Sequence, residues 1–300
     1  MAAVGVLVNA NAVSLARDAG LLQRLRTLVA GRPLAITRDP AEVARAIRLF
    51  RQQDVELICI HGGDGTALSV LTAAIEVYGE ALPRIALLRG GTINTLAKYL
   101  KIRGRPDDLL RRFLQDRQQA RKLAVIRVND CYGLTFGAAL MGRFYHEYNQ
   151  MERIDPPTVA GYVARVVLSA VFNTERACRL LAPVPATITV DGEVLPLDAC
   201  TVIVASCMEG HGFGVRPTYR GSSLPGHFQL LASAKGQAEI ARGYHRLLLG
   251  RPFTGDDHFD GMVRQARISF CGPELCMVDG EVFEAEQVDL AIGPTFEFVQ

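Results

Sequence analysis

The sequence lacks tryptophan, has few aromatic residues (7%) and contains no uninterrupted apolar run long enough to cross a bilayer. Its first 13 residues carry no charged segment ahead of the apolar ones, so we expect a buried strand there rather than a secretory signal. Internal repeats and low-complexity linkers are also absent. With 49% hydrophobic and 21% charged residues, the 300-residue chain can bury a sizeable core, which excludes disordered and collagen-like classes.

The seven cysteines form no CxxC pair, and the closest two, Cys271 and Cys276, do not match a usual zinc spacing. We interpret them as reduced core thiols of a cytoplasmic protein and predict no metal or redox centre built on cysteine.

A net charge of +2 conceals two halves of opposite sign. Residues 1–122 hold 19 Lys/Arg and 11 Asp/Glu, whereas residues 123–300 hold 14 and 20. This asymmetry predicts two domains, with the basic one facing an anionic partner. Low aromatic content and the lack of a recognised motif argue against nucleic acid as that partner.

The first half, 1–122, alternates between strand and helix patterns. Apolar runs at 5–10, 34–38, 55–60 and 84–88 predict strands, separated by helical patterns at about 14–30, from Pro40, up to Tyr78 and after residue 94. This alternation predicts an α/β domain with a doubly wound parallel sheet.

The second half, 123–300, is rich in strand patterns joined by glycine-containing turns, with helical segments near 157–172 and 236–249. We expect a mainly antiparallel β-sandwich or flattened barrel, and leave open whether the last few residues return to the first domain. A cleft between the two domains is the default ligand site.

Two glycine-rich loops follow neighbouring predicted strands. His61-Gly62-Gly63-Asp64-Gly65-Thr66 opens a helix, where glycines and unpaired N–H groups suit a phosphate. Asp64 would act through Mg²⁺ or as a base, or would simply cap the helix. The second loop runs from Arg89 to Asn94, and both should meet at one sheet edge. The pair predicts a phosphate site that is neither a Walker nor a Rossmann fingerprint.

A third element, Val278-Asp279-Gly280-Glu281, has the letters of an ordinary hairpin turn. The sequence contains its own control, because Val190-Asp191-Gly192-Glu193 has the same letters. Local pattern alone therefore assigns catalysis to neither copy.

Together, HGGDGT, the following GGTIN and the late VDGE resemble the diacylglycerol kinase catalytic-domain family, which includes bacterial lipid kinases, sphingosine kinases and ceramide kinases. The resemblance implies a two-domain kinase whose first domain binds ATP with Mg²⁺ and whose second binds a lipid alcohol. It implies Asp279 or Glu281 as the general base. The implied nucleotide-binding residues are Asn9, Thr37, Gly62, Gly63, Asp64, Gly65, Thr66, Gly91, Thr92 and Asn94, with Asp64 also the implied Mg²⁺ ligand through ATP.

Several positions depart from the family pattern. Ala10 replaces a proline, Ser69 replaces a glutamate and Thr95 replaces an aspartate. Pro225-Gly226 stands where many bacterial members have an Asp-Gly that helps hold a structural metal. These losses weaken the expectation of a structural Mg²⁺ and keep a non-catalytic nucleotide or lipid sensor as an alternative.

Two segments bear on membrane contact. Residues 98–122 hold nine basic and three acidic residues, which predicts either docking on anionic headgroups or a solvated helix face with Leu109, Leu110 and Phe113 packed inward. Apolar residues in 159–172, around Tyr162 and Phe172, would line an acyl-chain pocket or form core.

The leading hypothesis is an ATP-dependent kinase acting on diacylglycerol, a sphingoid base or ceramide, in the cytoplasm with peripheral contact to an anionic membrane. A soluble kinase of the NAD kinase type is the alternative enzyme. The acceptor and the oligomeric state, a homodimer included, stay open.

Overall fold

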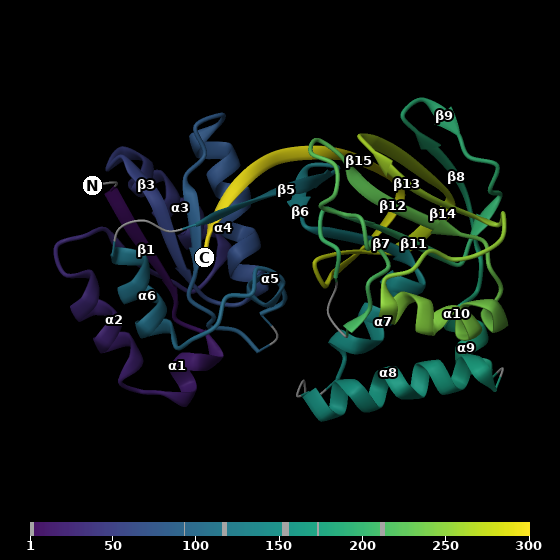
Figure 1. Cartoon of the computed structure of the whole chain (residues 1–300), viewed down its shortest axis with the longest axis horizontal. Coiled ribbons are helices and arrows are strands. Elements are labelled where there is room, and N and C mark those ends of the chain that lie inside the picture. Colours follow the sequence, from purple (N-terminus) through teal and green to yellow (C-terminus); the bar gives the residue numbers. More distant parts are fainter. Residues whose placement is uncertain (1–2, 93, 116–118, 152–155, 173, 211–213) are drawn as a thin grey trace. The chain divides into compact units, whose positions relative to one another are not determined.

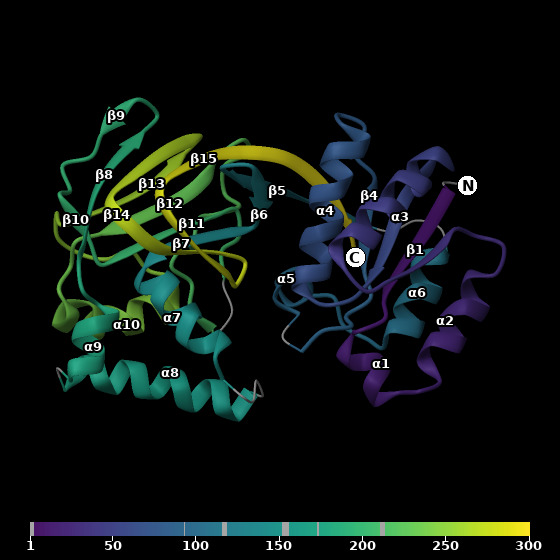
Figure 2. The same cartoon turned by 180° about the vertical axis from the view of Figure 1, so that it is seen from behind.

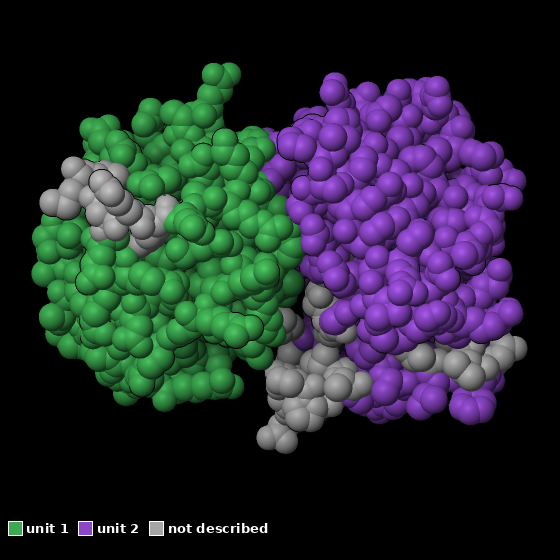
Figure 3. Space-filling view, in the orientation of Figure 1, with its two compact units in different colours: residues 1–123, 294–300 green, residues 124–293 purple. Residues whose placement is uncertain are grey.

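A computed structural model describes residues 3–92, 94–115, 119–151, 156–172, 174–210 and 214–300. The chain divides into two compact units, residues 1–123 with 294–300, and residues 124–293 (Figure 3).

The first unit has a parallel sheet in the order β4-β3-β1-β2, with the end of β15 added beside β4. Its strands are β1 (Ala3–Asn9), β2 (Leu34–Thr37), β3 (Val55–His61) and β4 (Arg84–Leu87). Its helices are α1 (Val13–Arg17), α2 (Leu21–Val29), α3 (Pro40–Gln52), α4 (Asp64–Tyr78), α5 (Thr95–Tyr99) and α6 (Pro106–Leu114).

The parallel strands bring four sequence positions to one edge of this sheet. β1 ends at Asn9, β2 at Thr37, β3 at His61 and β4 at Leu87, and these are the carboxyl ends of neighbouring strands. The order of the strands reverses between β1 and β3, and such a switch point is where open α/β sheets bind ligands.

The sequence predicted one helical stretch over 14–30, but the structure has two helices there, α1 and α2. The Asp18 carboxylate accepts a hydrogen bond from the Gly20 N–H at 3.2 Å. This local turn competes with helical hydrogen bonding and ends α1 at Arg17.

The second unit is a mainly antiparallel β structure in which β11 pairs with β7 and β12, and β14 pairs with β7, β8 and β15. Its first strands are β5 (Ala120–Val128), β6 (Cys131–Gly133), β7 (Thr135–Ala139), β8 (Val184–Val190), β9 (Glu193–Val194) and β10 (Ala199–Cys200). They are followed by β11 (Val202–Ser206), β12 (Phe228–Ser233), β13 (His258–Val263), β14 (Gln265–Val278) and β15 (Glu281–Val299). The predicted fold class is confirmed.

Four helices gather on one side of this second unit (Figures 1 and 2). They are α7 (Leu140–Asn149), α8 (Pro156–Val171), α9 (Glu175–Leu180) and α10 (Gln237–Leu249). The sequence pattern predicted α8 and α10 but missed α7 and α9. A Cβ added at Gly142 would lie 1.8 Å from the Leu275 carbonyl oxygen, so α7 lies directly against β14. None of the described helices is long and apolar enough to cross a membrane.

The last residues of the chain complete the core of the first unit. Phe298 and Val299 pair with Ile85 and Ala86 of β4, and the Phe298 side chain is fully buried. We therefore expect Phe298→Ala to lower the free energy of unfolding by about 3–5 kcal/mol, the usual cost of truncating a buried phenylalanine. Urea unfolding measures this. Leu49→Ala is the control, because Leu49 is exposed on α3 and its truncation should cost less than about 1 kcal/mol.

Candidate functional site

The two glycine-rich loops touch through their backbones. The Gly90 N–H donates to the Gly62 carbonyl at 2.7 Å. A Cβ added at Gly91 would lie 2.5 Å from the Gly63 Cα, a distance that no side chain can occupy. Glycine at these positions therefore permits the loops to meet, as the sequence predicted for neighbouring strands.

Asp64 ties the first loop to the helix that follows the second. Its carboxylate accepts hydrogen bonds from the N–H groups of Thr95 at 2.9 Å and Leu96 at 3.1 Å. These are first-turn amides of α5, so Asp64 caps α5 rather than its own helix, α4. One lone pair on each oxygen is used, and the carboxylate retains further acceptor sites.

Asn94 is used within its own loop. Its φ of +52° places it in the left-handed region, which asparagine tolerates better than most residues. Its side chain accepts from the Gly91 N–H at 3.0 Å and donates to the Gly91 carbonyl at 2.6 Å. Asn94 thus shapes the second loop, whereas the neighbouring Thr92 is exposed.

Asn9 joins the end of β1 to the first loop. Its amide donates to the Thr66 hydroxyl at 2.7 Å, and its own oxygen accepts from the Asn11 N–H at 2.8 Å. Thr37 is buried at the end of β2, in register with Asn9. The structure therefore brings Asn9, Thr37 and the first loop to the same sheet edge.

The N-terminus of α4 has no side-chain cap. Helix geometry leaves its first N–H groups without partners inside the helix. A Cβ added at Gly65, in this first turn, would have no atom within 4 Å, so the space beside this residue is open. Unpaired amides, a positive helix end and open space together fit an anion such as phosphate.

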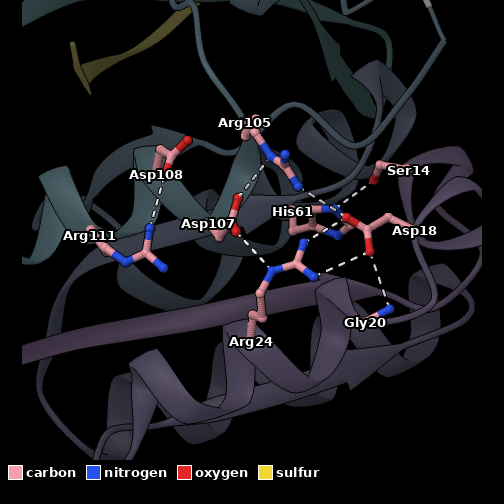
Figure 4. Close-up of polar contacts among 9 residues, drawn as sticks. All are labelled: Ser14, Asp18, Gly20, Arg24, His61, Arg105, Asp107, Asp108 and Arg111. Atoms are coloured by element: carbon pink, nitrogen blue, oxygen red, sulfur yellow. Dashed lines mark hydrogen bonds and ion pairs between the residues drawn. The ribbon is translucent and has the colours of Figure 1, made fainter.

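His61 is the first residue of the HGGDGT motif, and the sequence pattern predicted no role for it. Its side chain is fully buried, and its Nε2 lies 2.7 Å from the Ser14 hydroxyl (Figure 4). Burial lowers the pKa of His61 to about 4. The imidazole is therefore neutral near pH 7, and it links β3 to α1 without supplying positive charge.

An ion-pair network fixes the α1–α2 turn beside α6 (Figure 4). Arg24 bridges the carboxylates of Asp18 at 2.6 Å and Asp107 at 2.9 Å, and Arg105 also contacts both. The hydrogen bond from Arg24 lowers the pKa of Asp18. The network positions Ser14 and its helix at the edge of the site.

The two Asp-Gly hairpins of the second unit have the same local geometry. The Asp279 carboxylate accepts from the Leu134 N–H at 2.8 Å and the Thr135 N–H at 2.9 Å. The Asp191 carboxylate accepts from the N–H groups of Arg264 at 3.2 Å and Gln265 at 3.0 Å. Both aspartates have left-handed φ angles, of 49° and 48°. Glu281, two residues after Asp279, is exposed.

The position of the expected structural metal does not fit one. Pro225 has no side-chain oxygen, and its carbonyl accepts from His227 Nδ1 at 3.0 Å. His227 Nε2 in turn accepts from Arg264 Nε at 3.3 Å. This loop is therefore held by side chains of the chain itself. In the described part of the chain, no three His, Cys, Asp or Glu residues are grouped to hold a metal ion.

An apolar cavity of about 130 Å³ lies in the second unit, between the sheet and the helices. Val163 and Val166 of α8 line it, opposite Val204 and Leu231 of the sheet, and Tyr244 of α10 also contributes. These α8 residues fall within the segment for which the sequence left acyl-chain pocket and core as alternatives.

Comparison with known proteins bears out the family resemblance. Residues 4–128 match the model of the diacylglycerol kinase catalytic domain. The proteins named "probable lipid kinase YegS" from Escherichia fergusonii and Salmonella arizonae are 32% identical over 91 residues and 30% identical over 119 residues. These alignments cover 30% and 40% of this chain, and 27% and 36% of the relatives, so this chain matches between a quarter and little more than a third of their length.

The fold is similar over almost the whole chain to solved structures. A crystal structure of a diacylglycerol kinase from Bacillus anthracis has a TM-score of 0.68 at 16% identity and covers 99% of this chain and 96% of its own. A second structure from the same organism gives a TM-score of 0.72 at the same identity and coverage.

The buried His61 predicts a pH dependence of stability. Unfolded histidine binds a proton below about pH 6.5, whereas folded His61 stays neutral down to about pH 4. The unfolded state therefore binds more protons in this window, so stability is lost as pH falls through it. Between neutral pH and about pH 4.5 we expect the wild type to lose about 2 kcal/mol more than His61→Gln. Urea unfolding of both proteins at each pH measures this, and parallel losses would contradict a buried neutral imidazole.

Proposed function

We propose that this chain, whose residues 4–128 match the diacylglycerol kinase catalytic domain, is an ATP-dependent lipid kinase that phosphorylates the hydroxyl of a lipid alcohol. The observation that carries the proposal is the open N-terminus of α4, where two interlocked glycine-rich loops meet at the switch point of a parallel sheet. The first unit then binds ATP and the second binds the lipid.

The phosphates of ATP would be held by backbone amides rather than by lysine. The loop residues Gly62, Gly63 and Gly65 permit close approach, and the Thr66 hydroxyl, which accepts from Asn9, keeps its own hydrogen to donate. Gly91, Thr92 and Asn94 form the second wall, and Thr37 lies with Asn9 beside the nucleotide.

Magnesium would come with ATP and neutralise phosphate charge during transfer. Asp64 is the carboxylate of the first loop. Its bonds to the Thr95 and Leu96 amides leave acceptor sites on both oxygens, and these would fit a contact with Mg²⁺. Holding the carboxylate on two amides fixes its direction.

The apolar cavity of the second unit supports a lipid as acceptor. Its lining is formed by aliphatic and aromatic side chains, which suit a hydrocarbon chain and not a nucleoside. We propose diacylglycerol, sphingoid base or ceramide as the acceptor class.

Asp279 or Glu281 would take the proton of the attacking hydroxyl. The lipid oxygen then bonds to the γ-phosphorus, the bond to the bridging oxygen breaks, and ADP leaves. Asp279 is held by two amides, whereas Glu281 is exposed. We propose that Asp279 fixes the hairpin and Glu281, the less constrained of the two, receives the proton.

The nucleotide site is tested by Gly65→Ala. Its methyl group fills open space, so the fold should keep its stability and gain up to about 1 kcal/mol from helix propensity. ATP affinity should fall at least tenfold, measured by calorimetric titration with ATP·Mg²⁺. Unchanged ATP affinity would show that the phosphates of ATP do not bind at the N-terminus of α4. The matched control is Gly161→Ala, because Gly161 also lies in a helix and its added methyl group would also meet open space. This variant should keep the wild-type ATP affinity.

Phosphoryl transfer is tested with labelled ATP·Mg²⁺, a panel of lipid alcohols in mixed micelles, and NAD as soluble acceptor. Glu281→Gln should lower kcat by about 100-fold or more, the usual contribution of a general base. Asp191→Asn is the control for Asp279→Asn, because the two aspartates make equivalent bonds. Loss of kcat in Asp279→Asn, together with a wild-type kcat in Glu281→Gln, would make Asp279 the base instead. A labelled NAD product would overturn the proposal in favour of a soluble kinase. ATP binding without any labelled product would overturn it in favour of a non-catalytic sensor.

A further inference from the structure

Helix α8 is apolar on both of its faces. Its 16 residues contain one charged side chain, Arg165. The inner face buries Tyr162 and directs Val163 and Val166 to the cavity. On the opposite face Leu168 is 54% exposed, and Phe172, just beyond the helix, is 74% exposed. Large apolar side chains exposed on the outer face of a helix normally mark a surface that a partner covers.

Helix α10 packs against α8 and repeats this arrangement. Leu247 lines the cavity, whereas the next two residues, Leu248 and Leu249, are 43% and 58% exposed. In the described part of the second unit, α8 is the outermost helix, on the side of α7, α9 and α10 that faces away from the sheet (Figures 1 and 2).

Each helix presents arginine and apolar residues along one stripe. Arg165, Leu168 and Phe172 are spaced i, i+3 and i+7, and so are Arg242, His245 and Leu249. Residues at this spacing share a helix face. All six of these residues are exposed, and we refer to the two stripes together as the α8/α10 face.

The charge of this region is opposite to that of the unit that carries it. Residues 124–293 contain 14 Lys/Arg and 19 Asp/Glu. The segments 156–180 and 237–251, which contain α8, α9 and α10, hold six arginines and only two glutamates. Exposed apolar side chains among arginines suit the interface of an anionic bilayer, where rings and aliphatic groups enter the acyl boundary and guanidinium groups meet headgroups.

The length of α8 agrees with an interfacial position. Sixteen residues extend about 24 Å, which is short of the roughly 30 Å hydrocarbon core, so the helix would lie along the surface. The same two helices also line the apolar cavity, and a lipid chain destined for that cavity must leave a bilayer or micelle.

We propose that the α8/α10 face docks on an anionic lipid bilayer, with Leu168, Phe172 and Leu249 inserted and Arg165 and Arg242 on headgroups. The docking itself follows from exposure and charge; the passage of substrate between the two helices rests on the proposed function. The basic segment 98–122 differs from this face, because its apolar residues Leu109, Leu110 and Phe113 are buried and only charge faces outward.

The test is sedimentation of the full chain, without ATP, with vesicles of phosphatidylcholine alone or mixed with phosphatidylglycerol. Leu168→Gln with Phe172→Gln should weaken binding to the mixed vesicles at least tenfold, since burying each side chain contributes about 1.5–3 kcal/mol. Arg165→Gln with Arg242→Gln should weaken it about fivefold or more, and only where phosphatidylglycerol is present, since each charge contributes about 1 kcal/mol. Leu49→Gln with Val194→Gln is the matched control, because these side chains are 55% and 66% exposed outside the face; it should bind like the wild type.

Three results would overturn the proposal: no vesicle binding by the wild type, unchanged binding by the Leu168/Phe172 variant, or equal loss in the control. If gel filtration instead shows a dimer that the Leu168/Phe172 variant dissociates, the face joins two copies of the chain. Kinase activity is read separately in detergent micelles. A docking variant that keeps wild-type activity there but loses vesicle binding supports docking, whereas absence of lipid phosphorylation by every protein, wild type included, overturns the proposed function and leaves the vesicle result standing.

Discussion

The candidate phosphate site depends on one carboxylate. Asp64 accepts two amides at the start of α5, which lies 31 residues further along the chain. This contact and the Gly90–Gly62 hydrogen bond hold the loops after β3 and β4 as one unit. Without them, the uncapped first turn of α4 would face solvent with no second wall. Asp64 holds the two loops together. The hydrogen bonds of Asn94 to Gly91 shape the second loop, and the Asn9–Thr66 hydrogen bond ties the first loop to β1.

The second unit shows how one local pattern serves two places. Asp191 and Asp279 each start a tight turn with a left-handed φ and each accept two amides from an adjacent segment. The chemistry of the two hairpins is therefore the same at short range. Any difference in role must come from what surrounds the turn. Glu193 and Glu281 are both exposed, whereas Asp279 is half-buried and Asp191 is exposed.

The helices of the second unit carry apolar residues toward two environments. Their inner faces close an apolar cavity against β11 and β12, while their outer faces leave leucine and phenylalanine exposed. A protein that takes a lipid from a bilayer needs both surfaces, because the chain must remain in an apolar environment while it moves. At Pro225, where an Asp-Gly would help hold a structural metal, His227 and Arg264 fix the loop instead.

The sequence by itself determined the parallel and antiparallel halves, both glycine-rich loops and the Asp-Gly turns, since each depends on periodicity or turn chemistry within a few residues. It missed α7 and α9, and the break at Asp18, because short helices and turns are settled by what they pack against. Tertiary structure decided that Asp64 caps α5, that His61 is buried against Ser14, and that Val163 faces a cavity while Leu168 faces outward. These outcomes join residues far apart in the chain, and a local pattern holds no information about which distant groups will satisfy a carboxylate or cover an apolar face.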